Sequence, residues 1–269
     1  MIVILVPTFN CIDRIGITLD SLLDKHALNV IISDNFSTDG TWEYIKLRCS
    51  GMDNFEISQN ISNIGRVGNW NKCLILAERR TAKMIMFLMA GDSLKSDFES
   101  NIPTSKHSAK KLLVYAPIEL LTARGRIISR RSRYVDRFID GQTMLYHLLK
   151  YGIPFLGPLQ ANLLFSSSGR FPKFRDEVDG YYADQHFIVD FIADGCEVAI
   201  TLNPFSSFNQ MFNRTHNSLF VVERLLGDFS FISNVYHRVF GMEPPLWVKV
   251  RWGFINISRY LLGYFRRYV

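Results

Sequence analysis

The first part of the chain alternates between short unbroken apolar runs and stretches with helical spacing of apolar residues. Residues 2–6 are apolar without alternation, which is typical of a parallel strand covered on both faces. Apolar residues then recur at helical spacing from Ile12 to Leu23, and a second short strand is predicted over residues 30–33. A strand, a helix and a buried strand are predicted next, at Phe55–Ser58, Val67–Ala77 and Met84–Met89. This order predicts an open, mostly parallel α/β sheet flanked by helices, with right-handed crossovers.

The pattern weakens in the second half of the chain, where strands are predicted at Lys111–Leu120 and Leu159–Phe165 around a basic stretch at Arg124–Arg133. The less regular second half is a candidate for binding a second substrate. The expected division is a domain over 1–243, made of a nucleotide-binding half at 1–103 and an acceptor half at 104–243, and a tail at 244–269.

Asp34 ends the second predicted strand and is followed by the polar loop Ser37–Thr41. Open α/β sheets bind nucleotides beyond the carboxyl ends of their strands, so Asp34 is a candidate for contacting a nucleotide. The loop is also compatible with a purely structural role, because its residues can turn the chain and cap the next helix.

Four ordered motifs give the chain a resemblance to a known family. They are VPTFN from residue 6, SDNFSTDGT from residue 33, Asn63-Ile64-Gly65, and MIMFLMAGDSL from residue 84. Together they resemble family 2 glycosyltransferases of the GT-A fold, over roughly residues 1–200. The resemblance implies transfer of a sugar, with inversion, from a nucleotide diphosphate donor to a lipid-linked or free glycan acceptor, in bacterial O-antigen or capsule synthesis.

The same resemblance implies a set of donor-binding residues. Thr8 and Asp34 match positions that contact the base and ribose, whereas Asp13 is equally explained as a helix-start residue. Asn63 and Asn71 match amides that hold the loop beside the donor, although Asn63-Ile64-Gly65 is also a plausible turn. The expected set is Pro7, Thr8, Asn10, Asp13, Asp34, Asn63, Gly65, Asn71, Gly91, Asp92, Arg214 and His216, the last two either meeting the phosphates or lying on the surface.

Asp92 is the expected metal ligand. In the family, the strand before it ends in an acidic cluster that holds a divalent ion, Mn2+ or Mg2+, against the diphosphate. This chain reads Met89-Ala90-Gly91-Asp92-Ser93, so a single carboxylate remains, and metal dependence is open to question. The alternative role for Asp92 is capping a turn.

Asp184 is the expected general base. It precedes a helical pattern and resembles the family's acidic pair before a helix, with Ala183 in place of the first acid. Partial desolvation there would raise the basicity of the carboxylate. The alternative is an ordinary helix cap, with Asp179 and Glu177 as substitute bases.

The composition agrees with a globular enzyme and removes other classes. The chain has 269 residues, 48% of them hydrophobic, and a net charge of +6, which suits a protein that handles diphosphates or touches anionic lipid. Its four cysteines show neither paired nor metal-binding spacing, which predicts a reduced compartment. No G-x-G-x-x-G, Walker lysine loop, G-x-S-x-G or H-E-x-x-H motif occurs. The chain therefore lacks the motifs expected of dinucleotide-binding proteins, P-loop proteins, hydrolases of the G-x-S-x-G type and zincins.

The tail predicts contact with a membrane surface. Residues 246–269 contain five basic residues, no acid and many aromatic residues, a pattern typical of a helix lying in a bilayer interface. A helix packed on the catalytic domain is the alternative. With no long apolar segment and no nucleic-acid surface elsewhere, we expect a cytoplasmic protein at the inner face of the plasma membrane. A non-catalytic scaffold or donor-binding protein of the same fold is the second hypothesis.

Overall fold

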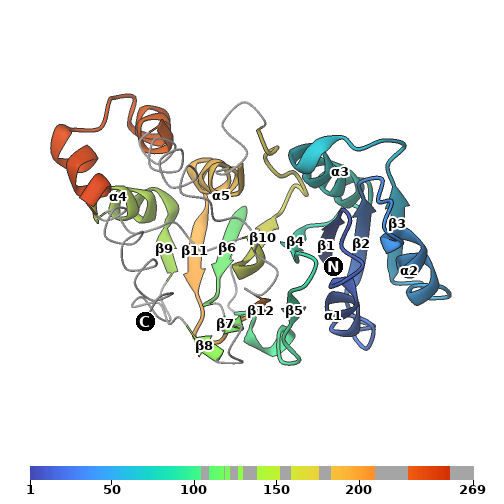
Figure 1. The fold of residues 1–269 in the computed structure, drawn as a ribbon. Coiled ribbons are helices and arrows are strands. Elements are labelled where there is room, and N and C mark those ends of the chain that lie inside the picture. The colour runs from blue at the N-terminus through green and yellow to red at the C-terminus, as the bar shows by residue number, and fades with distance from the viewer. Residues whose placement is uncertain are drawn as a thin grey trace.

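The computed structural model describes residues 1–103, 109–117, 119–121, 127–129, 138–151, 159–175, 183–209 and 230–254. Within them, an eight-stranded main sheet runs through the molecule (Figure 1). In spatial order its strands are β3 (Phe55–Gln59), β2 (Asn29–Asp34), β1 (Ile2–Thr8), β4 (Met84–Phe87), β10 (Asn162–Ser166), β6 (Lys111–Tyr115), β11 (Glu197–Ile200) and β9 (Phe138–Asp140). Only β10 and β9 run against the rest, so the sheet is mostly parallel, as predicted.

Helices cover both faces of this sheet (Figure 1). One face carries α3 (Gly65–Arg79), α4 (Gly141–Tyr151) and α5 (Ala183–Ala193), and the other carries α1 (Ile15–Asp20) and α2 (Thr41–Arg48). Residues 230–240 and 246–254 are also helical, and the 3-10 turns are η1 (Glu99–Asn101) and η2 (Leu159–Ala161). No helix in the described ranges is long and apolar enough to cross a bilayer.

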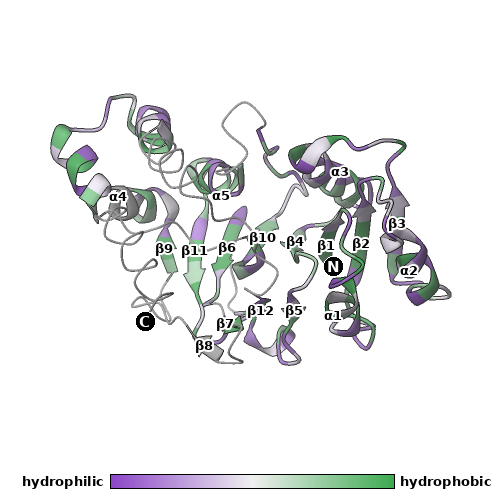
Figure 2. Ribbon diagram, in the orientation of Figure 1, coloured by the Kyte–Doolittle hydropathy of each residue, from purple (hydrophilic) through white to green (hydrophobic). Residues whose placement is uncertain are grey.

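Two buried apolar clusters explain why β1 and β2 lack alternation. Leu5 and Ile31 face α3 and α5, whereas Ile4 and Ile32 face α1 and α2, and all four side chains are fully buried. Successive side chains of a strand point to opposite faces, so a strand covered on both must be apolar throughout. The hydropathy colouring shows these strands as apolar, with polar residues at their ends (Figure 2).

A second sheet, in the lower part of Figure 1, differs from the expectation. Its strands, in spatial order, are β5 (Ser93–Leu94), β12 (Ser206–Asn209), β7 (Glu119–Leu121) and β8 (Ile127–Ser129). The single strand expected over Lys111–Leu120 is therefore two strands, β6 and β7, in different sheets. Pro117 separates them, because proline has no N–H to give to a ladder.

The first helix is also shorter than its apolar pattern predicted. It ends at Asp20, and the amides of Leu22 and Leu23 both turn back to the carbonyl of Leu19. The apolar side chain of Leu22 is still fully buried, so the pattern reported burial correctly but not helix length.

Candidate functional site

The candidate site lies at the edge where the parallel strands end. Thr8 at the end of β1 is in register with Asp34 at the end of β2, which is in register with Gln59 at the end of β3. Helices α3 and α5 each precede a strand of this parallel set, β4 and β11, so they start at the same edge. The fold thus brings Thr8, Asp34 and the helix start at Asp184 to the same edge of the sheet.

Asp34 is fully buried and accepts hydrogen bonds from four donors. Oδ1 accepts from Thr8 Oγ1 at 3.0 Å and Ser37 Oγ at 2.6 Å. Oδ2 accepts from the Ser37 amide and from Gln59 Nε2, both at 3.0 Å. A carboxylate has about four acceptor positions, so all of them serve the protein here. Any contact from Asp34 to a ligand would therefore replace or share one of these bonds.

A buried amide network lies beside Asp34, and the sequence did not reveal it. Asn69 is 3% exposed, donates to the backbone carbonyls of Thr8 and Ser33, and accepts from Ser33 Oγ at 2.7 Å and Asn60 Nδ2 at 3.0 Å. Each of these groups would be costly to bury alone, so the network is satisfied as a unit. The signal in the sequence was an asparagine directly after each of two strands, Asn35 after β2 and Asn60 after β3.

Asn35 extends this network to the start of α3. It donates to Asn63 Oδ1 at 2.8 Å and to the Gly65 carbonyl at 3.2 Å, and it accepts from the Ile64 amide at 3.0 Å. Gly65 has φ +76°, a conformation that favours glycine, and donates its amide to Asn63 Oδ1 at 2.9 Å. The predicted Asn63 and Gly65 therefore belong to the site's framework.

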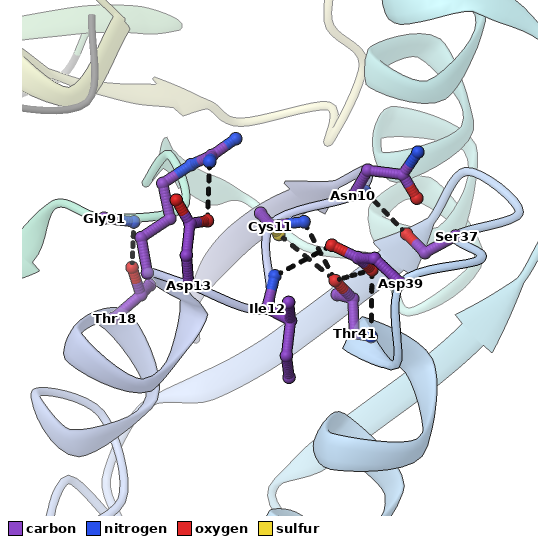
Figure 3. A network of polar contacts seen from close by, with 10 residues as sticks. Asn10, Cys11, Ile12, Asp13, Thr18, Ser37, Asp39, Thr41 and Gly91 are labelled. Atoms are coloured by element: carbon purple, nitrogen blue, oxygen red, sulfur yellow. Dashed lines mark hydrogen bonds and ion pairs between the residues drawn. The ribbon is translucent and has the colours of Figure 1, made fainter.

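The loops after β1 and β2 are joined by hydrogen bonds (Figure 3). Asn10, at φ +43°, donates its amide to Ser37 Oγ and accepts from the Thr38 amide, each at 2.9 Å. Asp39 accepts from the Ile12 amide at 3.1 Å and from the hydroxyl of Thr41 at 2.6 Å. The loop Ser37–Thr41 thus forms hydrogen bonds within itself, as its polar residues indicated, and also to the loop after β1.

Two further predicted residues lie at the margin of this framework. Pro7 sits in β1 opposite Ser33. Asp13 forms an ion pair of 2.8 Å with Arg14, and its side chain is 47% exposed. Neither residue joins the buried network through a bond seen in the described residues.

The side chain of Asn71 binds the backbone of Phe174 and makes no hydrogen bond to the loop at Asn63 that is seen in the described residues. Its side chain makes a reciprocal pair with the backbone of Phe174, donating at 2.9 Å and accepting at 2.8 Å. The Phe174 ring packs between Trp70 of α3, at 5.0 Å, and Phe187 of α5, at 4.1 Å. The two helices that start at the site are thereby fixed relative to each other.

Gly91 and Asp92 form a tight turn after β4. Gly91 has φ +98° and donates its amide to Thr18 Oγ1 at 2.9 Å (Figure 3). The Asp92 carboxylate is 4% exposed and accepts from Gln160 Nε2 at 2.8 Å and from the Asn209 amide at 3.0 Å. Burial raises its pKa to about 7, against the lowering effect of these two donors.

Asp92 does not fit the metal-ligand role that the resemblance implied. Both of its oxygens accept hydrogen bonds from neutral donors of the protein, and the residue is buried. Divalent ions of this kind need several hard oxygen ligands, and in the part of the chain that the structure describes no three His, Cys, Asp or Glu side chains converge. The observed hydrogen bonds instead connect the turn after β4 to η2 and β12.

Asp184 lies in the first turn of α5 and is partly buried. Its Oδ1 accepts from the Gln185 amide at 2.8 Å, and Oδ2 is 3.5 Å from Gln185 Nε2. Desolvation raises its pKa, and the nearby positive charge of Arg66 acts in the opposite direction. A carboxylate in this environment binds a proton more strongly than an exposed one. Arg214, His216, Glu177 and Asp179 lie outside the described residues.

The N-terminal third of the chain carries the family match. Residues 3–92 match the model described as glycosyl transferase family 2. In this segment, about a third of the chain, the sequence is similar to the family 2 glycosyltransferases. The matched segment contains Thr8, Asp34, Asn63 and Asp92, and a search of curated proteins finds no match.

Solved structures agree with a GT-A fold. The chain is similar to S. aureus TarS 1-349 in complex with UDP, with a TM-score of 0.57 and 16% identity over 90% of this chain and 72% of that one. It is similar to the UDP-GlcNAc complex of the same protein, with a TM-score of 0.57 and 16% identity over 93% of this chain and 78% of that one. It is also similar to mannosyltransferase PcManGT from Pyrobaculum calidifontis with GDP-Man and Mn2+, with a TM-score of 0.57 and 14% identity over 96% and 74%.

Replacing Asn69 tests the amide network. We expect Asn69→Ala to lower the free energy of unfolding by about 3 kcal/mol, because it leaves buried carbonyl and hydroxyl groups without partners. Asn203→Ala, at an exposed asparagine whose side chain bonds to Asn101, should cost less than about 1 kcal/mol. Urea unfolding measures both, and equal losses would contradict the network's role.

The raised pKa of Asp92 makes a pH-dependent prediction. The folded state holds this proton up to about pH 7, whereas the unfolded chain releases it near the ordinary value of 3.8, so ionisation lowers stability as pH rises through that window. Asp92→Asn removes the titration and keeps the shape, since Gln160 can turn its amide oxygen toward the new amide. We expect wild type to lose ~2–4 kcal/mol between pH 4.5 and 7.5 relative to the variant.

An exposed aspartate provides the control for that experiment. Asp24→Asn should leave the pH dependence as in wild type, because Asp24 is exposed. The measurement is urea unfolding at several pH values. Parallel pH curves for wild type and Asp92→Asn would show that Asp92 is ionised at little cost.

Proposed function

We propose that the chain transfers a sugar, with inversion, from a nucleotide diphosphate sugar to a glycan acceptor carried on a lipid, in bacterial surface-polysaccharide synthesis. The observation that supports this most directly is the position of Asp184. A desolvated carboxylate lies at the same sheet edge as Asp34 and the strand ends of the family segment. In this proposal, residues 1–103 bind the donor and residues 104–243 bind the acceptor.

The proposed chemistry is a single displacement. Asp184 takes the proton of an acceptor hydroxyl, the hydroxyl oxygen bonds to the anomeric carbon, and the bond from that carbon to the diphosphate breaks. The nucleoside diphosphate leaves with the bonding electron pair. Burial favours this use of Asp184 because it raises the proton affinity of the carboxylate.

The proposed donor class is supported by the family segment and by the similar solved structures. The similar structures hold UDP, UDP-GlcNAc or GDP-Man. In this chain, Thr8 and Asp34 stand at the end of the strands where an open α/β sheet binds nucleotides. We therefore propose a nucleoside diphosphate sugar as donor.

The proposed membrane contact is supported by the helix over residues 246–254. Val248 and Trp252 are buried in the core, which is the packed arrangement that the sequence left open. Leu246, Trp247 and Phe254 are 76%, 51% and 75% exposed on the same helix. An exposed group of large apolar side chains marks a contact surface, and with the basic residues of this segment it suits the inner face of a plasma membrane. Residues 255–269 lie outside the described part of the tail.

A non-catalytic scaffold or donor-binding protein of the same fold is the second candidate. This candidate is supported by the motif at Met89–Ser93, which has only one carboxylate, Asp92, and that carboxylate binds Gln160 and the Asn209 amide. Incubating purified protein with nucleotide sugars and measuring donor hydrolysis or transfer separates the two, because a scaffold carries out neither reaction.

Asp184→Asn tests the proposed base. Asparagine keeps the size and hydrogen bonding but cannot take up a proton near neutral pH, so we expect transfer to fall about 100-fold or more while donor affinity stays within about 3-fold. Asp194→Asn, at an exposed residue that follows the same helix, should leave both unchanged. Near wild-type transfer by a folded Asp184→Asn protein would remove this residue from the mechanism.

The triple variant L246S/W247S/F254S tests the membrane surface. We expect its affinity for phosphatidylglycerol vesicles to fall about 10-fold or more in co-sedimentation, because the exposed apolar area is lost while the buried Val248 and Trp252 remain. Leu47→Ser changes a side chain that is 75% exposed on α2 and should bind as wild type does. Equal binding by the triple variant would favour a helix that serves packing alone.

A further inference from the structure

Arg66 is the second residue of α3, and its backbone is fixed next to the loop that follows Asp34. The preceding residue, Gly65, is bonded through its carbonyl to Asn35 and through its amide to Asn63. Asn35 directly follows Asp34. The position of Arg66 is therefore set by the same network that organises the strand ends.

The guanidinium of Arg66 is held over an aromatic ring. Its central carbon lies 5.1 Å from the ring centroid of Trp70, one turn later on α3. Trp70 is itself packed against Phe174, which stacks on Phe187 of α5. A guanidinium on an aromatic face keeps its N–H groups at its edge, where they can bind an anion.

Arg66 is exposed, and no ion pair among the described residues includes it. The ion pairs within the described ranges involve other cations, and no acidic residue lies in the first turn of α3. By contrast, Arg48, Arg80 and Arg175 each pair with a carboxylate. The guanidinium of Arg66 is thus available to a ligand.

The place of Arg66 in the site matches one part of the donor. Its backbone lies beside the loop after Asp34, where the nucleoside is proposed to bind, and its charge acts on the carboxylate of Asp184, the proposed base. A diphosphate joins the nucleoside to the reacting sugar carbon, so it must span the same interval. The leaving diphosphate also gains negative charge as the bond breaks, and a fixed cation stabilises that change.

The two oxygens of Asp92 bind Gln160 and Asn209, so Asp92 does not hold a divalent ion that would stabilise the leaving diphosphate. We propose that Arg66 binds the diphosphate of the donor and supplies there the positive charge that a divalent ion supplies in sites with a converging acidic cluster. This inference rests on the proposed function, since it presupposes a nucleotide sugar at this edge.

Nucleotide binding by variants of Arg66 tests the inference. The probes are UDP, GDP and the corresponding nucleosides, titrated calorimetrically into the full chain in EDTA and again with Mn2+. We expect Arg66→Gln to weaken binding of the preferred nucleoside diphosphate about 10-fold or more, with nucleoside affinity within about 2-fold, because only the phosphate contact is lost. Arg66→Lys should recover part of the loss, and EDTA should change wild-type affinity less than about 2-fold.

The same helix offers a matched control. Arg79 is exposed in the last turn of α3, at the opposite end of the helix, and Arg79→Gln should bind as wild type does. Added salt should weaken wild-type binding more than binding by Arg66→Gln, since a screened charge contact is present only in the former.

The outcomes separate this inference from the proposed function. If wild type binds a nucleoside diphosphate but Arg66→Gln binds it equally well, or if EDTA abolishes wild-type binding, the Arg66 assignment is overturned while the glycosyltransferase proposal stands. If wild type binds neither UDP nor GDP and transfers no sugar, the proposed function fails and this inference fails with it.

Discussion

The buried carboxylate of Asp34 organises the edge of the sheet on which the rest of the site depends. A charge with no exposed surface must be compensated by hydrogen bonds, and Asp34 obtains them from β1, from β3 and from its own loop. These bonds fix the relative positions of the strand ends. The amide network of Asn35, Asn60 and Asn69 continues this arrangement to the start of α3. Loops that would otherwise be mobile are thereby held in one conformation before any ligand arrives.

Asp92 has an equivalent structural role between the two halves of the chain. Its carboxylate binds Gln160 of η2 and the backbone of Asn209 at the end of β12, while its carbonyl accepts from Thr18 of α1 at 2.8 Å. Neutral donors stabilise a buried carboxylate only partly, which is why its pKa rises. The single acid of the motif at Met89–Ser93 thus contributes to assembly of the fold.

Aromatic packing couples the two helices that begin at the site. Phe174 lies between Trp70 of α3 and Phe187 of α5, and its backbone is held by Asn71. Arg66 and Asp184, at the starts of these helices, therefore belong to one rigid arrangement. The helix over residues 246–254 packs Val248 and Trp252 into the same core cluster as α3 and α5 and leaves other apolar side chains exposed.

Up to Met89, the sequence by itself determined the order of strands and helices, and it indicated the mostly parallel sheet and the family segment, because unbroken apolar runs and helical spacing report directly on burial. It also placed Thr8, Asp34 and Asp184 at strand or helix ends, where the fold brings them to one edge. Tertiary structure decided which groups each side chain meets. Asp92 and the Asn209 amide are 117 positions apart, Asn71 and Phe174 are 103 apart, and no local pattern encodes such pairs. Lys111–Leu120 became two strands for a similar reason, since Pro117 ends one ladder and only the partner strands β10 and β12 decide where each piece pairs. A polar residue's type shows which bonds it can form, but its burial and partners depend on segments that the fold alone brings together.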